Sequence, residues 1–166
     1  MSIKFAIHKD VRGWVPSGEN LRKLREYFES PAMQAAMGSD SLTVSYWPRV
    51  LASDILKRKV EPYAFRAVTR DGAESVVFCD ETETPLSIAW LTAHELAHQV
   101  VAHTPTLKAA FEDTKPQDLD PATDRYHQVD PGERFADGVA TRIFRQRLDR
   151  DWWRERVRLA KQGLGS

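Results

Sequence analysis

The stretch "LSIAWLTAHELAHQVVAH", residues 86–103, combines an apolar helix pattern with several titratable side chains. Its apolar residues recur at helical spacing and predict a helix that is buried in the core. Just before it, Thr84 suits an N-cap and Pro85 suits the first helical position, so we expect the helix to begin there. Yet the stretch holds three of the chain's five histidines, and Glu95 directly follows His94. Ionisable groups in such a helix indicate a functional site.

His94 and His98 are four residues apart, so a helix presents both imidazoles on one face. Together with Glu95 they form HExxH, the pattern in which two histidines bind zinc and the glutamate serves the metal-bound water. The alternative is a pair of histidines that are hydrogen-bonded in or near the core. We favour the metal site because the pattern lies in an apolar helix that follows a predicted β-hairpin.

A catalytic zinc needs a third protein ligand and one open position. Val101 and Thr104 stand where a metzincin would have glycine and histidine, which excludes that subclass. His103 follows the second histidine by five residues and so points to another face of the helix; it suits the C-terminal turn better than a ligand role. Glu133 is the better candidate, because it lies on the apolar face of a helix predicted over about 130–146.

Glu133 also has a simpler interpretation, since Asp130 to Glu133 reads as an N-cap followed three residues later by its glutamate. That interpretation alone would leave Glu133 exposed at a helix start. Asp137, one turn further on, could accept a hydrogen bond from a ligand histidine and fix its tautomer. Alternatively, Asp137 forms a surface ion pair with Arg134 or Arg142.

The rest of the chain predicts a single α+β domain over residues 1–166. We expect an N-terminal part of strands and helices over about 1–60, a metal-binding core over about 63–146 and a basic helix over about 150–161. In the first part, "IKFAI" and "LTVSYW" read as strands, and "ENLRKLREYF" and the residues from Pro31 to Gly38 read as helices. In the core, Asp71-Gly72 predicts the turn of a β-hairpin between "YAFRAVTR" and "ESVVFCD".

A long connection, residues 104–131, separates the two helices that carry the candidate ligands, and it has room for one short helix at about 105–113. Tyr126 and His127 lie in this connection and are candidate donors for a reaction oxyanion. The alternative for both is a loop residue that packs locally.

Composition favours a protein without membrane spans and without a nucleic-acid partner. The formal net charge is +0, and no apolar run approaches the 18 to 20 residues of a membrane helix. The single cysteine, Cys79, excludes an internal disulfide and fits a reducing compartment, so we expect a cytoplasmic protein. We interpret Cys79 as a structural residue rather than a metal ligand. The basic helix at 150–161 could bind phosphates or an acidic partner, or could be a solvated face.

The segments "AHELAHQVVAH" and "ERFADGVA" together resemble the gluzincin pattern HExxH…ExxA[DN], and within that clan they are most similar to the ImmA/IrrE-type metallopeptidases. The resemblance implies a zincin-like fold, with a small mixed or antiparallel sheet packed on the active-site helix. It also implies that His94, His98 and Glu133 bind Zn²⁺ and that Glu95 is the catalytic base. Members of the family cleave or bind transcriptional repressors.

The sequence therefore predicts a zinc-dependent endopeptidase that acts on a protein or peptide substrate, with its oligomeric state left open. The strand "SVVFCD" is expected at a sheet edge, where it would align an extended substrate. Two rivals come from other classes. One is a non-catalytic, zinc-containing module that recognises a regulatory protein, and the other is a DNA-associated protein that uses the basic C-terminal helix.

Overall fold

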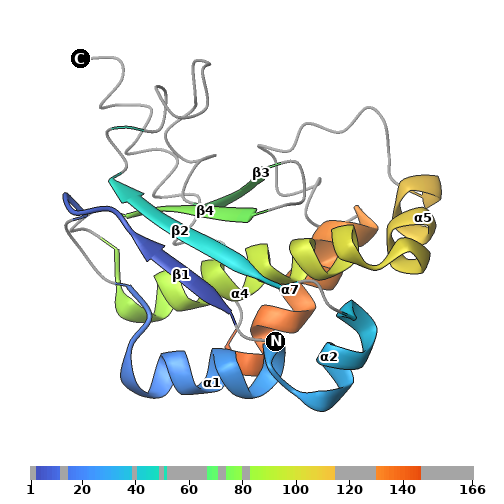
Figure 1. The fold of residues 1–166 in the computed structure, drawn as a ribbon, viewed down its shortest axis with the longest axis horizontal. Coiled ribbons are helices and arrows are strands. Elements are labelled where there is room, and N and C mark those ends of the chain that lie inside the picture. The colour runs from blue at the N-terminus through green and yellow to red at the C-terminus, as the bar shows by residue number, and fades with distance from the viewer. Residues whose placement is uncertain are drawn as a thin grey trace.

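The computed structural model describes residues 3–11, 15–38, 41–48, 51, 67–70, 74–79, 83–114 and 130–146. Within these ranges the chain forms a mixed α/β structure of four strands and five helices (Figure 1). The strands are β1 (Lys4–Ile7), β2 (Thr43–Pro48), β3 (Ala67–Arg70) and β4 (Glu74–Cys79). The helices are α1 (Gly18–Phe28), α2 (Pro31–Met37), α4 (Pro85–His103), α5 (Pro105–Thr114) and α7 (Pro131–Phe144). These elements confirm the helices and strands that the sequence predicts within the described ranges.

The strands form one mixed sheet in the order β1-β2-β4-β3. The β1, β2 and β4 strands are parallel, and only β3 runs antiparallel, in the predicted hairpin with β4. The expectation of an antiparallel sheet is therefore wrong, and that of a mixed sheet is confirmed. The chain order gives the physical reason for the parallel pairing of β1 and β2, because the helices α1 and α2 between them return the chain to the end of the sheet at which β1 begins. Another correction concerns β4, which is an interior strand, whereas the edge beside it is β3.

Helix α4 lies at the centre of the structure, with the sheet on one side and α1 and α7 on the other (Figure 1). It begins as the sequence predicts. The Thr84 side chain accepts a hydrogen bond from the Ser87 amide, and the Ser87 hydroxyl accepts one from the Thr84 amide, both at 3.1 Å. This reciprocal cap satisfies amides that the first helical turn leaves without partners.

Two polar groups tie α4 to the sheet. The Gln99 amide donates to the Thr43 carbonyl at 2.7 Å and to the Ser75 hydroxyl, and its oxygen accepts from the Thr43 amide at 3.1 Å. Two turns earlier, the Tyr46 hydroxyl donates to Thr92 Oγ1 at 3.0 Å. These buried bonds fix both the position of α4 and its rotation about its axis, because each joins one face of the helix to particular strand residues.

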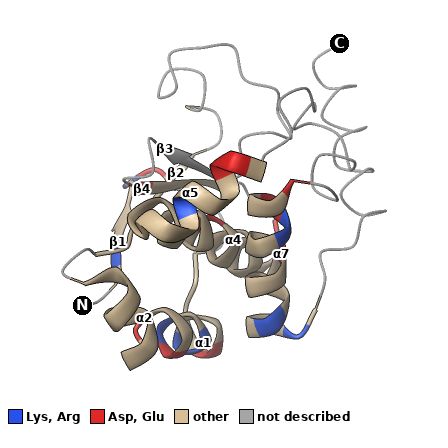
Figure 2. Ribbon diagram, turned by 90° about the vertical axis from the view of Figure 1, so that its right-hand side faces the viewer, with Lys and Arg blue, Asp and Glu red and all other residues tan. Residues whose placement is uncertain are grey.

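Charged residues lie on α1, α5 and α7, around an almost uncharged α4 (Figure 2). Glu95 is the only Asp, Glu, Lys or Arg in α4. No helix in the described part of the chain is long and apolar enough to cross a membrane. Several predicted features lie outside the described residues: the turn at Asp71-Gly72, Tyr126 and His127, and the basic helix at 150–161.

Candidate metal centre

The two histidines of α4 point toward α7. Their Nε2 atoms are 3.1 Å apart, and their ring centroids are 4.8 Å apart. The His94 side chain is buried, whereas that of His98 is 22% exposed. The spacing of four residues accounts for this convergence, since the two side chains lie on the same face of the helix, one turn apart. The greater exposure of His98 leaves its side of the pair open to solvent.

Glu133 closes the cluster from α7. Its Oε2 lies 3.1 Å from His94 Nε2, and its Oε1 lies 3.2 Å from His98 Nε2. The Glu133 backbone amide donates to the Asp130 side chain at 2.9 Å, so the N-cap interpretation holds as well. The two interpretations are compatible because the amide takes part in the cap while the side chain points inward to the histidines.

These distances fit a metal ion. Ligand atoms on a tetrahedral zinc, with bonds of about 2.0–2.1 Å, are about 3.3–3.4 Å from one another. The three separations among His94 Nε2, His98 Nε2 and the nearest Glu133 oxygens are 3.1, 3.1 and 3.2 Å. The donor set, two imidazoles and one carboxylate, is also that of many catalytic zinc sites. The residues present therefore suit zinc.

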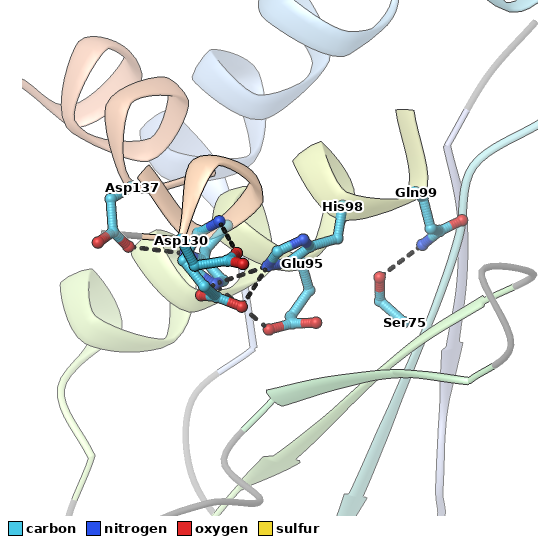
Figure 3. Close-up of polar contacts among 8 residues, drawn as sticks. Ser75, Glu95, His98, Gln99, Asp130 and Asp137 are labelled. Carbon is cyan, nitrogen blue, oxygen red and sulfur yellow. Dashed lines mark hydrogen bonds and ion pairs between the residues drawn. The ribbon is translucent and has the colours of Figure 1, made fainter. Parts of the chain in front are cut away.

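Asp137 holds the other nitrogen of His94. Its Oδ1 lies 2.9 Å from His94 Nδ1, and Figure 3 shows Asp137 on the far side of the cluster from His98. Because a carboxylate only accepts hydrogen bonds, the Nδ1 atom must carry a proton. In the neutral imidazole the lone pair is then on Nε2, the atom that faces Glu133 and His98.

The charges within the cluster shift two pKa values. Burial of His94 opposes its protonation, but hydrogen bonds to Asp137 and Glu133, together with the charges of Glu133 and Glu95, raise its pKa well above the ordinary value. Burial would raise the pKa of Glu133, but its hydrogen bonds with His94 and His98 lower that pKa far below the ordinary value. The carboxylates of the cluster therefore favour a cation beside the two imidazoles, which a proton or a metal ion could supply.

Glu95 is buried beside the cluster, with its Oε1 3.7 Å from His94 Nε2. Glu95, His94 and His98 present potential ligand atoms that all lie within 4.8 Å of one another, so this trio alone is a candidate metal group. Glu133 is the stronger candidate for a third ligand, since its Oε2 lies 3.1 Å from His94 Nε2 whereas Glu95 Oε1 lies 3.7 Å from that atom. Figure 3 shows Glu95 extending from α4 on the side of the sheet, next to His98. This position suits a base that acts on a molecule bound at the cluster.

Two residues of α4 that the structure shows to matter were not singled out from the sequence. Trp90 stacks on the His94 ring at this centre, and Gln99, the residue after His98, joins α4 to the sheet. Each had a visible signal: Trp90 precedes His94 by four residues, and Gln99 is a polar residue in an apolar helix. Cys79 is buried in the hydrophobic core, in agreement with a structural role.

No protein-family model, curated protein or solved structure matches this chain. The functional assignment therefore rests on the geometry of the cluster formed by α4 and α7.

Proposed function

We propose that the protein is a zinc-dependent endopeptidase with a zincin-like fold, in which His94, His98 and Glu133 bind the metal. The observation that carries the proposal is the convergence of the two Nε2 atoms and both Glu133 oxygens within 3.1–3.2 Å. A buried cluster of two lone pairs and a carboxylate repels itself unless a cation joins it. The packing of the site helix against a mixed sheet further supports this class of fold.

Zinc, when bound, supplies a Lewis acid that lowers the pKa of a water molecule and polarises the scissile carbonyl. Glu95 accepts the proton of the attacking water on a carboxylate oxygen and transfers it to the nitrogen of the leaving amine. Asp137 keeps the proton on His94 Nδ1, so that Nε2 stays available as a ligand. The substrate reaches the site from the side of His98, which is the more exposed of the two histidines.

The substrate we propose is a protein. The ImmA/IrrE-like motifs suggest a transcriptional repressor as one such substrate, and the buried Glu95 supports catalysis over mere binding. A purely structural zinc site has no use for a buried carboxylate that stands outside the ligand distances.

The test combines metal content with turnover. Zinc per chain is measured by mass spectrometry, and hydrolysis of fluorescein-labelled casein is followed for the wild type, Glu95→Gln and Glu133→Ala. We expect one zinc in the wild type and in Glu95→Gln, with turnover lost by a factor of about 10²–10⁴ in Glu95→Gln. We expect Glu133→Ala to lose zinc. Glu112→Gln, an exposed glutamate on α5, is the matched control and should behave as the wild type.

Each part of the proposal has its own contrary result. A wild type that binds no zinc rules out the metal centre. Zinc with wild-type turnover in Glu95→Gln rules out Glu95 as the base. A third result would be a wild type that binds zinc and yet hydrolyses neither casein nor a candidate repressor that is incubated with the protein. That result favours the alternative of a non-catalytic module that recognises a regulatory protein.

A further inference from the structure

Trp90 lies against the metal centre although it is not a ligand. Its indole ring stacks on the His94 imidazole, with ring centroids 5.6 Å apart and planes inclined by 21°. The two residues are four apart on α4, so their side chains meet one above the other on the same helix face. Trp90 is only 5% exposed. A side chain of this size therefore covers one face of the ligand ring and shields it from solvent.

The indole is itself fixed by the second ligand helix. Trp90 Nε1 donates to the Gln146 carbonyl at 3.0 Å, just beyond the end of α7. Arg145, which stands between α7 and Gln146, has a left-handed backbone with φ of 53° and turns the chain at this point. The C-terminal end of α7 thus contacts α4 through Trp90.

Helix α7 therefore holds the His94 side chain at two separate places. Asp137 and Glu133 bind the two nitrogens of the ring, and the end of α7 binds the indole that packs on the face of the same ring. The hydrogen bonds to the nitrogens still permit the ring to tilt about the line between them. A nearly parallel indole removes that freedom, and its electron-rich face attracts an imidazole that shares charge with a cation.

We propose that Trp90 is a positioning residue for the metal ligand His94: it sets the plane of the imidazole and couples the metal centre to the end of α7. This inference rests on the proposed zinc function of the same site. It goes further in assigning a role to a buried aromatic residue that neither binds the metal nor contacts the substrate. The role differs from ordinary core packing because it predicts an effect on metal affinity rather than on stability alone.

The test measures zinc affinity by competition with a chromophoric chelator, for the wild type, Trp90→Phe, Trp90→Met and Leu24→Ala. Trp90→Met removes the ring, and we expect affinity to fall by a factor of about 10–100, as for other groups that orient a metal ligand. Trp90→Phe keeps a stacked ring and should stay within about threefold of the wild type. Leu24 is a fully buried residue of α1, so Leu24→Ala lowers stability and should leave the zinc affinity unchanged.

Two spectroscopic readouts complete the test. The visible absorption of the cobalt-substituted protein should change in Trp90→Met and not in Leu24→Ala, since it reports ligand geometry. In the wild type, zinc should alter the tryptophan fluorescence, and Trp90→Phe should lose that change while still binding zinc. This second readout remains informative if Trp90→Met does not fold.

The contrary results separate the inference from the function. If the wild type binds zinc and Trp90→Met does so with equal affinity and an unchanged cobalt spectrum, Trp90 is only a core residue and the zinc function stands. A fluorescence change that persists in Trp90→Phe also overturns the inference. If the wild type binds no zinc, the proposed function fails and the role of Trp90 fails with it.

Discussion

Asp137 Oδ1 lies 2.9 Å from His94 Nδ1, and this contact leaves the other nitrogen of His94, Nε2, facing Glu133 and His98, where we propose that the metal binds. Asp137 stands on α7 one turn after Glu133, so a single helix supplies both the proposed third ligand and the group that orients His94. The two carboxylates act on opposite nitrogens of one imidazole. Geometry of this kind fixes a ligand before the metal arrives, which lowers the entropic cost of binding it.

Replacing Asp137 by alanine should therefore weaken zinc binding while all three ligands remain in place. We expect the zinc affinity to fall by a factor of about 10–100, because His94 loses the acceptor that fixes its tautomer and orientation. A competition titration with a chromophoric chelator measures this change. Asp113→Ala removes an exposed aspartate from α5 and serves as the control. Equal affinity in both variants would show that the Asp137 contact does not orient the ligand.

Zinc binding should release a proton at neutral pH. The pKa of His94 is raised because Asp137, Glu133 and Glu95 together outweigh the burial of the ring, so the metal-free protein holds a second proton on this histidine, at Nε2. Zinc takes the same position and displaces that proton. The metal-bound state then carries fewer protons, which means that affinity rises with pH and falls as the pH drops, by roughly tenfold per pH unit for each proton displaced.

Isothermal titration calorimetry measures this release directly. The observed enthalpy of zinc binding should differ between buffers of different ionisation enthalpy at one pH, and the slope gives the number of protons. A slope of zero at pH 7 would mean that His94 is already neutral in the metal-free protein. The same titration on Asp137→Ala should give a smaller slope, because that variant lacks the carboxylate whose hydrogen bond raises the pKa of His94 most.

The central helix and its partner could be predicted from the sequence because their signals are local. Thr84 and Pro85 mark the start of α4, and the spacing of His94 and His98 on one helix makes them converge whatever the rest of the fold. The inward position of Glu133 could also be predicted, because this residue lies on the apolar face of its own helix. In these cases the pattern in one segment carries the information.

The order of the strands could not be predicted in the same way. The hairpin of β3 and β4 has a local turn signal, whereas the parallel pairing of β2 with β4 joins segments that are far apart in the chain. Such pairing depends on contacts between distant segments, and periodicity within one strand does not encode it. The bond from Trp90 to the Gln146 carbonyl was hidden for a similar reason, since it spans 56 residues and ends on a backbone atom.

The cap at the start of α4 offers a matched pair of variants. Thr84 accepts a hydrogen bond from the Ser87 amide, whereas Ser17, the N-cap of α1, makes no such bond with its side chain. Thr84→Ala should lower the free energy of unfolding by about 1 kcal/mol, and Ser17→Ala should leave it nearly unchanged. Urea unfolding at one fixed zinc concentration measures both. A similar loss in both variants would argue against a specific role for the Thr84 cap.

Gln99 should matter for stability far more than for metal binding. Its buried amide makes hydrogen bonds to both backbone groups of Thr43 and to Ser75, and a leucine of similar size would leave these groups without their partners. We expect Gln99→Leu to lower the free energy of unfolding by about 2–4 kcal/mol. The expected effect on zinc affinity is small, within about threefold, because Gln99 joins α4 to the sheet while the ligands join α4 to α7.

Urea unfolding of the metal-free protein and a zinc competition titration separate these two effects. Gln34→Leu is the matched control, since Gln34 lies on α2 and makes its side-chain bond to the Glu29 carbonyl at an exposed position; its free energy of unfolding should change by less than about 0.5 kcal/mol. If Gln99→Leu is as stable as the wild type, the bonds to the sheet do not hold α4 in place. If Gln99→Leu loses zinc affinity by more than about tenfold while the protein stays folded, the rotation of α4 set by Gln99 also determines how His98 meets the metal.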